Sequence, residues 1–388
     1  RESDIFLGGE ALGEDEAENL GKIYKWLDDI FWTGLWDSRE GREAAYAQLQ
    51  QLADLATAHF PSIVFGVGQA FYSYFWFADN GGELNMDAAM RSVALHELSL
   101  RQSGCDNLTM PVGSFLKSAC QDRWLYLIML CAEVGLEAAA RRADAAGAAR
   151  LLQRADGLFR EVEPYAFFGF RGWSSIYDVN TNSHVFPEHV RQRPVWPRGA
   201  IPLAEWFEAH AHVFRDDLDR ILRDDLFDEL YFKGRVSMTQ FSGRRESWAP
   251  LNLIHNRELA PHACEVANRS CELLLTRPEI ARCDAKDVGA AFARLAPGMG
   301  IKPHFWTAPP RLGVHLGLRV PPGASMAVGN RTVVWRDGEA VVFDDTYIHS
   351  VRHQGAETRY LLIAWFCHPC DPVHAEVPAE DPMGMCAP

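Results

Sequence analysis

Three segments near the C-terminal end decide the fold: HFWTAPPRLGVHLGLRV at residues 304–320, VVFDDTYIH at 341–349 and ETRYLLIAWFCHP at 357–369. Apolar and polar residues alternate in them, and a period of two residues is typical of β-strands. The segments carry histidines at positions 304, 315 and 349 and a further one in the closing HP, and Arg359 follows His349 by ten residues. Two histidines on neighbouring strands are the minimum that a metal site needs, and a planar guanidinium suits a dicarboxylate. We therefore expect a small β-barrel with a metal site.

Residues 311–320 show the cleanest alternation. One face of this strand is apolar, with Leu312, Val314, Leu316, Leu318 and Val320. The other face carries Arg311, Gly313, His315, Gly317 and Arg319. Arg311 and His315 are therefore expected to point to the same side, together with two glycines that leave space.

Tight turns separate the predicted strands. Gly329–Asn330 and Asp337–Gly338 both have the composition of two-residue hairpin turns. Several short antiparallel strands joined in this way favour a jelly roll, the double-stranded β-helix. Before it, the sequence predicts a strand at 235–245, a long loop at 246–263 and a short helix at 265–274.

The first 165 residues have a different period. Apolar residues recur three or four positions apart between residues 14 and 164, which indicates helices. Stacked helix pairs fit, of a tetratricopeptide-like kind, although no clean repeat of about 34 residues is visible. The fold class is therefore α+β, with a helical domain at 1–165, a connector at 166–200 and a strand-rich domain at 201–388. The helical domain either binds a partner or supports the rest of the chain.

Composition excludes some partners. The chain has 388 residues and a net charge of −14, which argues against nucleic acid, because nucleic-acid binding depends on clustered lysine and arginine. Residues 55–78 contain no Asp, Glu, Lys or Arg, but Pro61 and two glycines interrupt them. We expect a buried helix–turn–helix there rather than a membrane span. A membrane anchor would have to lie outside the given chain.

Cysteines and asparagines bear on the cellular compartment. Cys264 and Cys271 are close enough in sequence to close a small disulfide ring, and buried thiols are the alternative. Three glycosylation sequons begin at Asn107, Asn268 and Asn330. Together these features favour the secretory pathway, with the lumen of the endoplasmic reticulum as the expected location.

The histidines alone are weak support for a metal site. Non-haem iron oxygenases usually hold Fe(II) with two histidines and one carboxylate. The acid normally stands two residues after the first histidine, but Trp306 holds that position after His304 and Gly317 after His315. On chemistry alone, a structural histidine is the commoner case.

A family resemblance adds what the chemistry leaves open. Residues 176–369 resemble the aspartyl/asparaginyl β-hydroxylase family of Fe(II)- and 2-oxoglutarate-dependent oxygenases. The matching segments are IYDVNTN, RPVW, GRR, the Cys264–Cys271 pair, LAPG, the spacing from His304 to His315, HLGL, W-x-x-G, FDD-x-x-x-H, Arg359 and the closing HP. The last third of the chain carries the most specific of these segments.

The resemblance implies roles for individual residues. His304 and His349 resemble the two iron-binding histidines of a family that lacks the acidic ligand. His315 and Arg359 match positions that bind the cosubstrate 2-oxoglutarate, and Arg311 matches one that binds substrate. The reaction implied is hydroxylation by O₂, with release of succinate and CO₂, at the β-carbon of an Asp/Asn-type residue. The substrate would be a protein or peptide rather than a small molecule.

Other expectations concern the surroundings of the site. Asp344 or Asp345, with Asp345 preferred, would orient the ring of His349, as metal-bound histidines usually require. Three positions depart from the family: Trp306 replaces a small residue, Ala293 replaces a hydroxyl that binds 2-oxoglutarate, and Gly313 replaces a second arginine. Two alternatives follow. One is a non-catalytic binding or scaffold protein derived from the family, and the other is a lipid acyl-chain hydroxylase.

Overall fold

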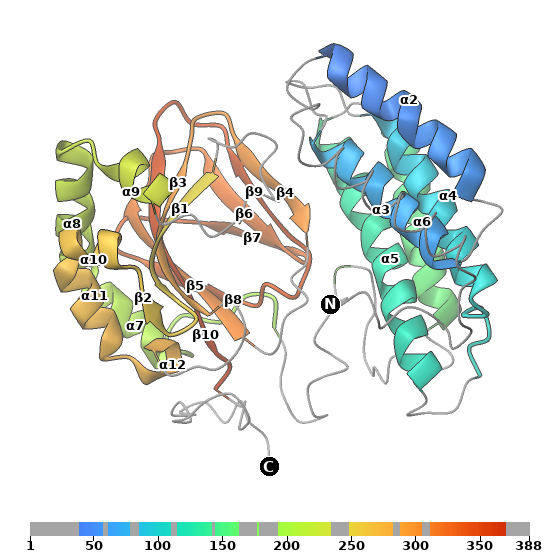
Figure 1. The fold of residues 1–388 in the computed structure, drawn as a ribbon. Helices are drawn as coiled ribbons and strands as arrows, with labels where there is room; N and C mark the ends of the chain where they lie inside the picture. The colour runs from blue at the N-terminus through green and yellow to red at the C-terminus, as the bar shows by residue number, and fades with distance from the viewer. Residues whose placement is uncertain are drawn as a thin grey trace. The chain divides into compact units, whose positions relative to one another are not determined.

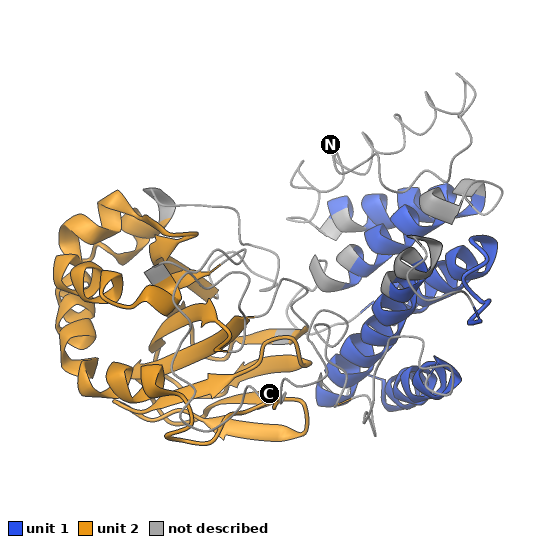
Figure 2. Ribbon diagram, turned by 90° about the horizontal axis from the view of Figure 1, so that it is seen from below, with its two compact units in different colours: residues 1–167 blue, residues 168–388 orange. Residues whose placement is uncertain are grey.

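The structure is a computed structural model. It describes residues 39–56, 61–77, 85–109, 115–141, 144–162, 177, 193–233, 248–281, 288–304 and 311–369. The chain divides into two compact units, residues 1–167 and 168–388 (Figures 1 and 2). Most of the predicted connector, the predicted strand at 235–245 and Trp306 lie outside the described residues.

Helices make up the described part of the first unit, as the period of its sequence predicts. They are α2 (Arg39–Ala56), α3 (Pro61–Phe77), α4 (Met86–Gln102), α5 (Phe115–Arg141) and α6 (Ala145–Val162). Each packs against the next along the chain. In α6 the buried residues include Leu151, Ala155, Leu158 and Val162, three or four positions apart, so one face of the helix points into the core. The side chain of Asn85 caps α4 by accepting a hydrogen bond from the backbone N–H of Ala88 at 2.9 Å.

The uncharged stretch at 55–78 contains a helix start. Helix α3 begins at Pro61, a position that suits proline because the first helical N–H needs no partner within the helix. Among the described helices, none is both long and apolar enough to span a bilayer. The pairs α3–α4 and α5–α6 begin at residues 61 and 115, a spacing of 115 − 61 = 54 residues. A tetratricopeptide repeat takes about 34 residues, so this spacing does not support a tetratricopeptide-like array.

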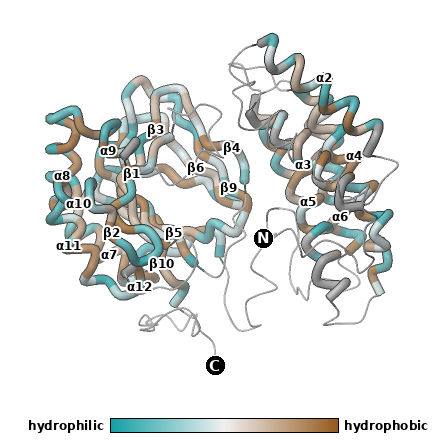
Figure 3. Tube along the Cα trace, in the orientation of Figure 1, coloured by the Kyte–Doolittle hydropathy of each residue, from teal (hydrophilic) through white to brown (hydrophobic). Residues whose placement is uncertain are grey.

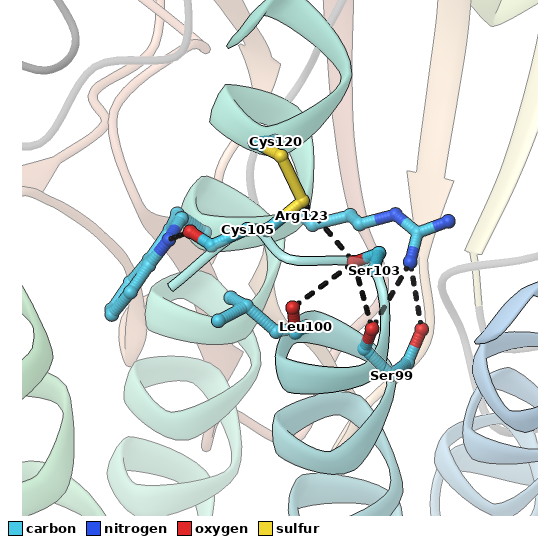
Figure 4. Close-up of a disulfide and its surroundings, with 7 residues drawn as sticks. Ser99, Leu100, Ser103, Cys105, Cys120 and Arg123 are labelled. Atoms are coloured by element: carbon cyan, nitrogen blue, oxygen red, sulfur yellow. Dashed lines mark hydrogen bonds between the residues drawn. A yellow bond between two sulfur atoms is a disulfide. The ribbon is translucent and has the colours of Figure 1, made fainter. Parts of the chain in front are cut away.

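A disulfide that the sequence analysis missed ties the loop after α4 to α5. Cys105 and Cys120 are joined with an S–S distance of 2.00 Å (Figure 4). Around it, the indole of Trp124 donates to the Cys105 carbonyl at 2.7 Å, and Arg123 donates to Ser99 Oγ at 2.9 Å. The bond therefore lies in an ordered contact between two helices, which sequence spacing alone could not identify.

Two antiparallel sheets form the centre of the second unit. The six-stranded sheet has the order β2 (Glu258–Leu259), β1 (Trp248–His255), β3 (Gly289–Leu295), β10 (Arg359–Cys367), β5 (Arg311–Arg319), β8 (Ala340–Phe343). The four-stranded sheet has the order β4 (Gly300–His304), β9 (His349–His353), β6 (Ala324–Val328), β7 (Arg331–Val334). From β3 onward the chain passes repeatedly from one sheet to the other. The mixture of helix and antiparallel sheet confirms the predicted class, and this alternation is consistent with a jelly-roll core.

Short helices cover the outer face of the six-stranded sheet (Figure 1). They are α7 (Pro202–Ala209), α8 (Ala211–Arg223), α9 (Phe227–Lys233), α10 (Pro261–Val266), α11 (Asn268–Leu275) and α12 (Pro278–Ala281). Hydrophobic and hydrophilic residues alternate along α8, as a helix with one buried face requires (Figure 3). Leu312, Val314 and Leu316 of β5 face these helices, as their alternation predicts. A second core, with Ala293, Met326 and Phe343, lies between the two sheets.

Two sequence predictions for this unit were wrong. The predicted loop at 246–263 contains β1, which is buried on almost its whole length, so its sequence lacks the alternation of a half-exposed strand. Gly329–Asn330 does form the hairpin between β6 and β7, where Val328 pairs with Arg331. Asp337–Gly338, however, lies on the crossover from β7 to β8, which belong to different sheets. Turn composition specifies a local bend but not which sheet the next strand joins.

Candidate active site

His304 and His349 lie side by side at one end of the four-stranded sheet. His304 is the last residue of β4, His349 is the first of β9, and the two are paired across the ladder. Their ring centroids are 4.1 Å apart. His349 is buried and His304 is half-buried. Because paired residues project to the same face of a sheet, the ladder brings both imidazoles to one point.

A backbone carbonyl orients the ring of His349. Its Nδ1–H donates to the Tyr347 carbonyl at 2.9 Å, so the ring is in the tautomer whose Nε2 carries a lone pair. Burial lowers the pKa of His349 to about 4, and the positive charge of Arg311 acts in the same direction. The imidazole is therefore neutral at pH 7, the form that binds metals. The expectation that Asp345 orients this ring was wrong, because Nδ1 bonds to the Tyr347 carbonyl and Asp345 accepts from Arg311 instead.

His315 and Arg359 lie on adjacent strands of the other sheet. His315 is in the middle of β5, and Arg359 is the first residue of β10, beside it. Arg359 is 1% exposed, and its Nε and Nη1 have no hydrogen-bond partner among the described residues. The same is true of His315 Nδ1. The ring of Trp335 contacts both, 4.6 Å from the Arg359 guanidinium and 5.8 Å from the His315 ring.

Burial sets the protonation of this pair. It lowers the pKa of His315 well below the usual value, and the nearby charge of Arg359 has the same effect. Burial also lowers the pKa of Arg359 to about 9, so the guanidinium is still charged at pH 7. A buried cation without a counter-charge is unfavourable, and an anion that accepts hydrogen bonds from it would remove the penalty. The pair therefore fits a carboxylate ligand.

Phe343 separates the two pairs of residues. Its ring centroid lies 4.7 Å from that of His315 and 5.7 Å from that of His349. The space that the two glycines of β5 were expected to leave is filled. A side chain at Gly313 would meet the Phe343 ring at 2.9 Å, and one at Gly317 would meet the Arg336 carbonyl at 2.1 Å. Both glycines thus serve close packing around His315 rather than an open cavity.

Arg311 lies near these residues but in a different state from Arg359. It donates to Asp345 Oδ2 from Nη2 at 2.8 Å and from Nε at 3.2 Å, and both side chains are 3% exposed. Its guanidinium also lies 5.1 Å from the centre of the Trp365 ring. Arg311 and Asp345 therefore form a buried, neutral pair. The position of Arg311 on the same strand face as His315 agrees with the alternation of β5.

Several other residues can now be placed. Ala293 is fully buried on β3 opposite Leu361 and belongs to the core between the sheets, on the side of the candidate site. Cys264 and Cys271 are joined with an S–S distance of 2.07 Å between α10 and α11. Phe343, Trp335 and the Tyr347 carbonyl were missed as site groups. For Phe343 and Trp335 the only signal was their place in the FDD and W-x-x-G segments.

The residues present fit a metal held by two histidines. Within the described part of the chain, no group of three or more His, Cys, Asp or Glu side chains could hold a metal ion. The pair His304–His349 would therefore leave most coordination positions to a ligand and to O₂ or water, as open catalytic sites do. The unpaired donors of Arg359 and His315 supply a place for the carboxylate of such a ligand.

The comparison with protein families gives a match over the C-terminal unit. Residues 208–369 match the family model described as Aspartyl/Asparaginyl beta-hydroxylase. A mouse (Mus musculus) protein named aspartyl/asparaginyl beta-hydroxylase is 28% identical over 199 residues, which is 50% of this chain and 25% of that protein. A human (Homo sapiens) aspartate beta-hydroxylase domain-containing protein 2 is 29% identical over 111 residues, 28% of this chain and 29% of that protein. The chain thus spans less than a third of the length of these relatives.

Among solved structures, a prolyl-4-hydroxylase from Pseudomonas putida is similar in part. The likeness covers 41% of this chain and 87% of that one at 18% identity, with a TM-score of 0.26. This score is too low to support an argument about the fold.

Proposed function

We propose that the chain is an Fe(II)- and 2-oxoglutarate-dependent dioxygenase, on the premise that residues 208–369 match the model of the aspartyl/asparaginyl beta-hydroxylase family. It would hydroxylate an unactivated C–H bond. The observation that carries the proposal is the combination of two adjacent histidines with a buried, uncompensated Arg359. A structural role does not explain why Arg359 has no carboxylate partner among the described residues, nor why it lies near His315.

Each residue has a physical task in this proposal. His304 and His349 would hold Fe(II), with the Tyr347 carbonyl fixing the tautomer of His349. Arg359 would bind a carboxylate of 2-oxoglutarate through parallel hydrogen bonds, and His315 would donate or accept beside it. Two neutral imidazoles, Fe²⁺ and the 2-oxoglutarate dianion sum to zero charge, so no acidic ligand is needed for neutrality. When bound, iron and 2-oxoglutarate supply the activation of O₂, with succinate and CO₂ as products.

The proposed substrate is an Asp/Asn-type residue in a protein or peptide, hydroxylated at its β-carbon. The family description and the names of the relatives support this class. The hydrophobic surroundings of the site, with Phe343 and Trp335, would exclude water from the reacting carbon.

Turnover of 2-oxoglutarate tests the proposal. The protein, loaded with Fe(II), is expected to convert 2-oxoglutarate to succinate, faster with a substrate from a panel of peptides, free amino acids and lipids. His304→Ala and His349→Ala should abolish this turnover, whereas His353→Gln, in the same strand as His349, should retain it. No succinate, together with no absorption band on anaerobic titration with Fe(II) and 2-oxoglutarate, would favour the non-catalytic binding protein. Stimulation by lipids alone would favour the acyl-chain hydroxylase.

We also propose that the chain passes through the secretory pathway. Asn107, Asn268 and Asn330, which begin the three sequons, are all exposed. The Cys105–Cys120 and Cys264–Cys271 disulfides are typical of an oxidising compartment. Expressed in eukaryotic cells, the protein should lose mass on treatment with a glycosidase specific for N-linked glycans. Unmodified asparagines at all three sites would contradict this location.

A further inference from the structure

One oxygen of Asp345 has no hydrogen-bond partner in the described part of the chain. Its Oδ2 accepts both hydrogen bonds from Arg311, while its Oδ1 is buried and has no partner among the residues that the structure describes. Buried acceptors normally have a donor, because an unsatisfied one loses its hydrogen bonds to water without replacement. A missing donor beside a candidate active site points to one that the ligand brings.

The position of this oxygen is near the two histidines. Phe343, whose ring contacts that of His349, precedes Asp345 by two residues, and His349 follows it by four. Arg311, which holds Asp345, lies close enough that its charge lowers the pKa of His349. Gly313, the next residue on this face of β5, faces the Phe343 ring. Asp345 is therefore bound to an arginine whose charge acts on His349, in the same part of the core as Phe343 and His349.

Among the side chains that the structure describes, both arginines near the site are already engaged in other roles. Arg359 is the uncompensated arginine of the pair, and in the proposed function the cosubstrate takes it. Arg311 is neutralised by Asp345 through two hydrogen bonds. A second carboxylate entering beside Asp345 would meet a negatively charged oxygen, and like charges at close range in a buried site repel strongly.

Resting on the proposed function, we propose that Asp345 determines substrate specificity: its Oδ1 accepts a hydrogen bond from an uncharged donor side chain, a carboxamide such as that of asparagine, and rejects the carboxylate of aspartate. The two groups have the same shape, so the choice depends on hydrogen-bond polarity and charge alone. Sites that pair a buried acceptor with a substrate donor discriminate far better than apolar pockets do.

The test uses a library of peptide pairs that are identical except for Asn or Asp at the central position. Succinate formation and the gain of one oxygen atom by the peptide are measured for the Fe(II)-loaded enzyme. The wild-type enzyme should favour Asn members by at least about tenfold in kcat/KM. A preference for Asp members, or equal responses to both, including no response to either, would overturn the proposal.

Two variants separate specificity from folding. Asp345→Asn leaves the Arg311 charge uncompensated, so the preference should invert towards Asp peptides. In case that variant does not fold, a second one combines Arg311→Gln with Asp345→Asn and keeps a neutral, hydrogen-bonding pair. Its ratio of kcat/KM for Asn peptides to that for Asp peptides should be close to one. A purely structural role of Asp345 would lower turnover of both peptides equally, and an unchanged ratio in the double variant would contradict the proposal.

Failure of this proposal is distinguishable from failure of the proposed function. Succinate formed without any peptide reports the iron and 2-oxoglutarate chemistry alone. If it is present and the peptide preference is absent, only the role of Asp345 is lost. If the wild-type enzyme forms no succinate with or without peptide and shows no absorption band on anaerobic titration with Fe(II) and 2-oxoglutarate, the proposed function itself fails.

Discussion

Two buried arginines lie near the histidines of the candidate site, Arg311 near His349 and Arg359 near His315, and they are in opposite states. Arg311 is neutralised by Asp345, whereas the Nε and Nη1 of Arg359 have no partner among the described residues. Both are almost completely buried. The charge of Arg311 lowers the pKa of His349, and that of Arg359 lowers the pKa of His315. Each arginine therefore acts on one histidine, but within the described ranges only Arg311 has a carboxylate partner.

This difference in pairing distinguishes a structural ion pair, Arg311–Asp345, from an arginine suited to bind a ligand, Arg359. A buried ion pair satisfies its own hydrogen bonds and keeps the surrounding core neutral. A buried cation without a partner lowers stability and is retained where a ligand completes it. Among the described residues, Arg359 thus has no anion to complete its hydrogen bonds. In the Arg311–Asp345 pair, Asp345 Oδ1 has no donor.

Removal of the paired arginine should have the largest effect on stability. Arg311→Met leaves Asp345 as an uncompensated buried charge, and the free energy of unfolding should fall by about 3–5 kcal/mol. Denaturant unfolding measures it. The double variant Arg311→Met with Asp345→Leu should recover most of the loss, because it removes both charges. A single variant as stable as the wild-type protein would mean that the pair is not buried and the comparison fails.

Removal of the unpaired Arg359 should not lower the free energy of unfolding of the ligand-free protein. Arg359→Met deletes a charge without a partner, so the free energy of unfolding without ligand should stay the same or rise. Affinity for 2-oxoglutarate, measured by anaerobic titration with Fe(II), should fall by roughly 100-fold, about 3 kcal/mol, because charge-assisted hydrogen bonds are lost. Arg319→Met, on an exposed arginine paired with Asp219, is the matched control and should change neither quantity. Undiminished affinity in Arg359→Met would show that Arg359 does not bind the cosubstrate.

The pH dependence of stability tests how far burial and the charge of Arg311 lower the pKa of His349. Because the pKa of His349 is lowered to about 4, the unfolded chain gains a proton between pH 6.5 and 4 that the folded chain does not. The stability of the metal-free protein should therefore fall with decreasing pH, by about 2 kcal/mol from this residue at pH 5 relative to pH 7. Unfolding of wild type and His349→Gln at both pH values measures it, with the exposed His262→Gln as control. Equal pH dependence in wild type and His349→Gln would contradict the lowered pKa.

The smallest effect is expected at Ala293. Ala293→Ser places a hydroxyl on the side of β3 that faces the other sheet, where it could donate to the cosubstrate bound by Arg359. Affinity for 2-oxoglutarate should improve about fivefold, roughly 1 kcal/mol. Ala291→Ser, two residues earlier on the same face, is the control and should only lower stability. Weaker 2-oxoglutarate binding in Ala293→Ser would show that the hydroxyl is buried without a partner.

Much of the site could be expected from the sequence. The alternation of residues 311–319 assigned Arg311 and His315 to one face, because the period of a strand is local. The spacing of His304 and His349 became informative through the family resemblance, and the ladder places the two side by side. The buried strand β1 was missed for an equally local reason, since a strand covered on both faces shows no alternation.

The sequence by itself determined which residue types lie on which strand face, and with them the candidates for metal and carboxylate binding. Only the tertiary structure decided which charges meet. Arg311 and Asp345 are 34 positions apart (345 − 311), and their pairing depends on how β5 lies against the turn that follows β8. No described carboxylate pairs with Arg359. Strand periodicity is a property of neighbouring residues, whereas the partner of a buried charge is set by which strands the fold brings together.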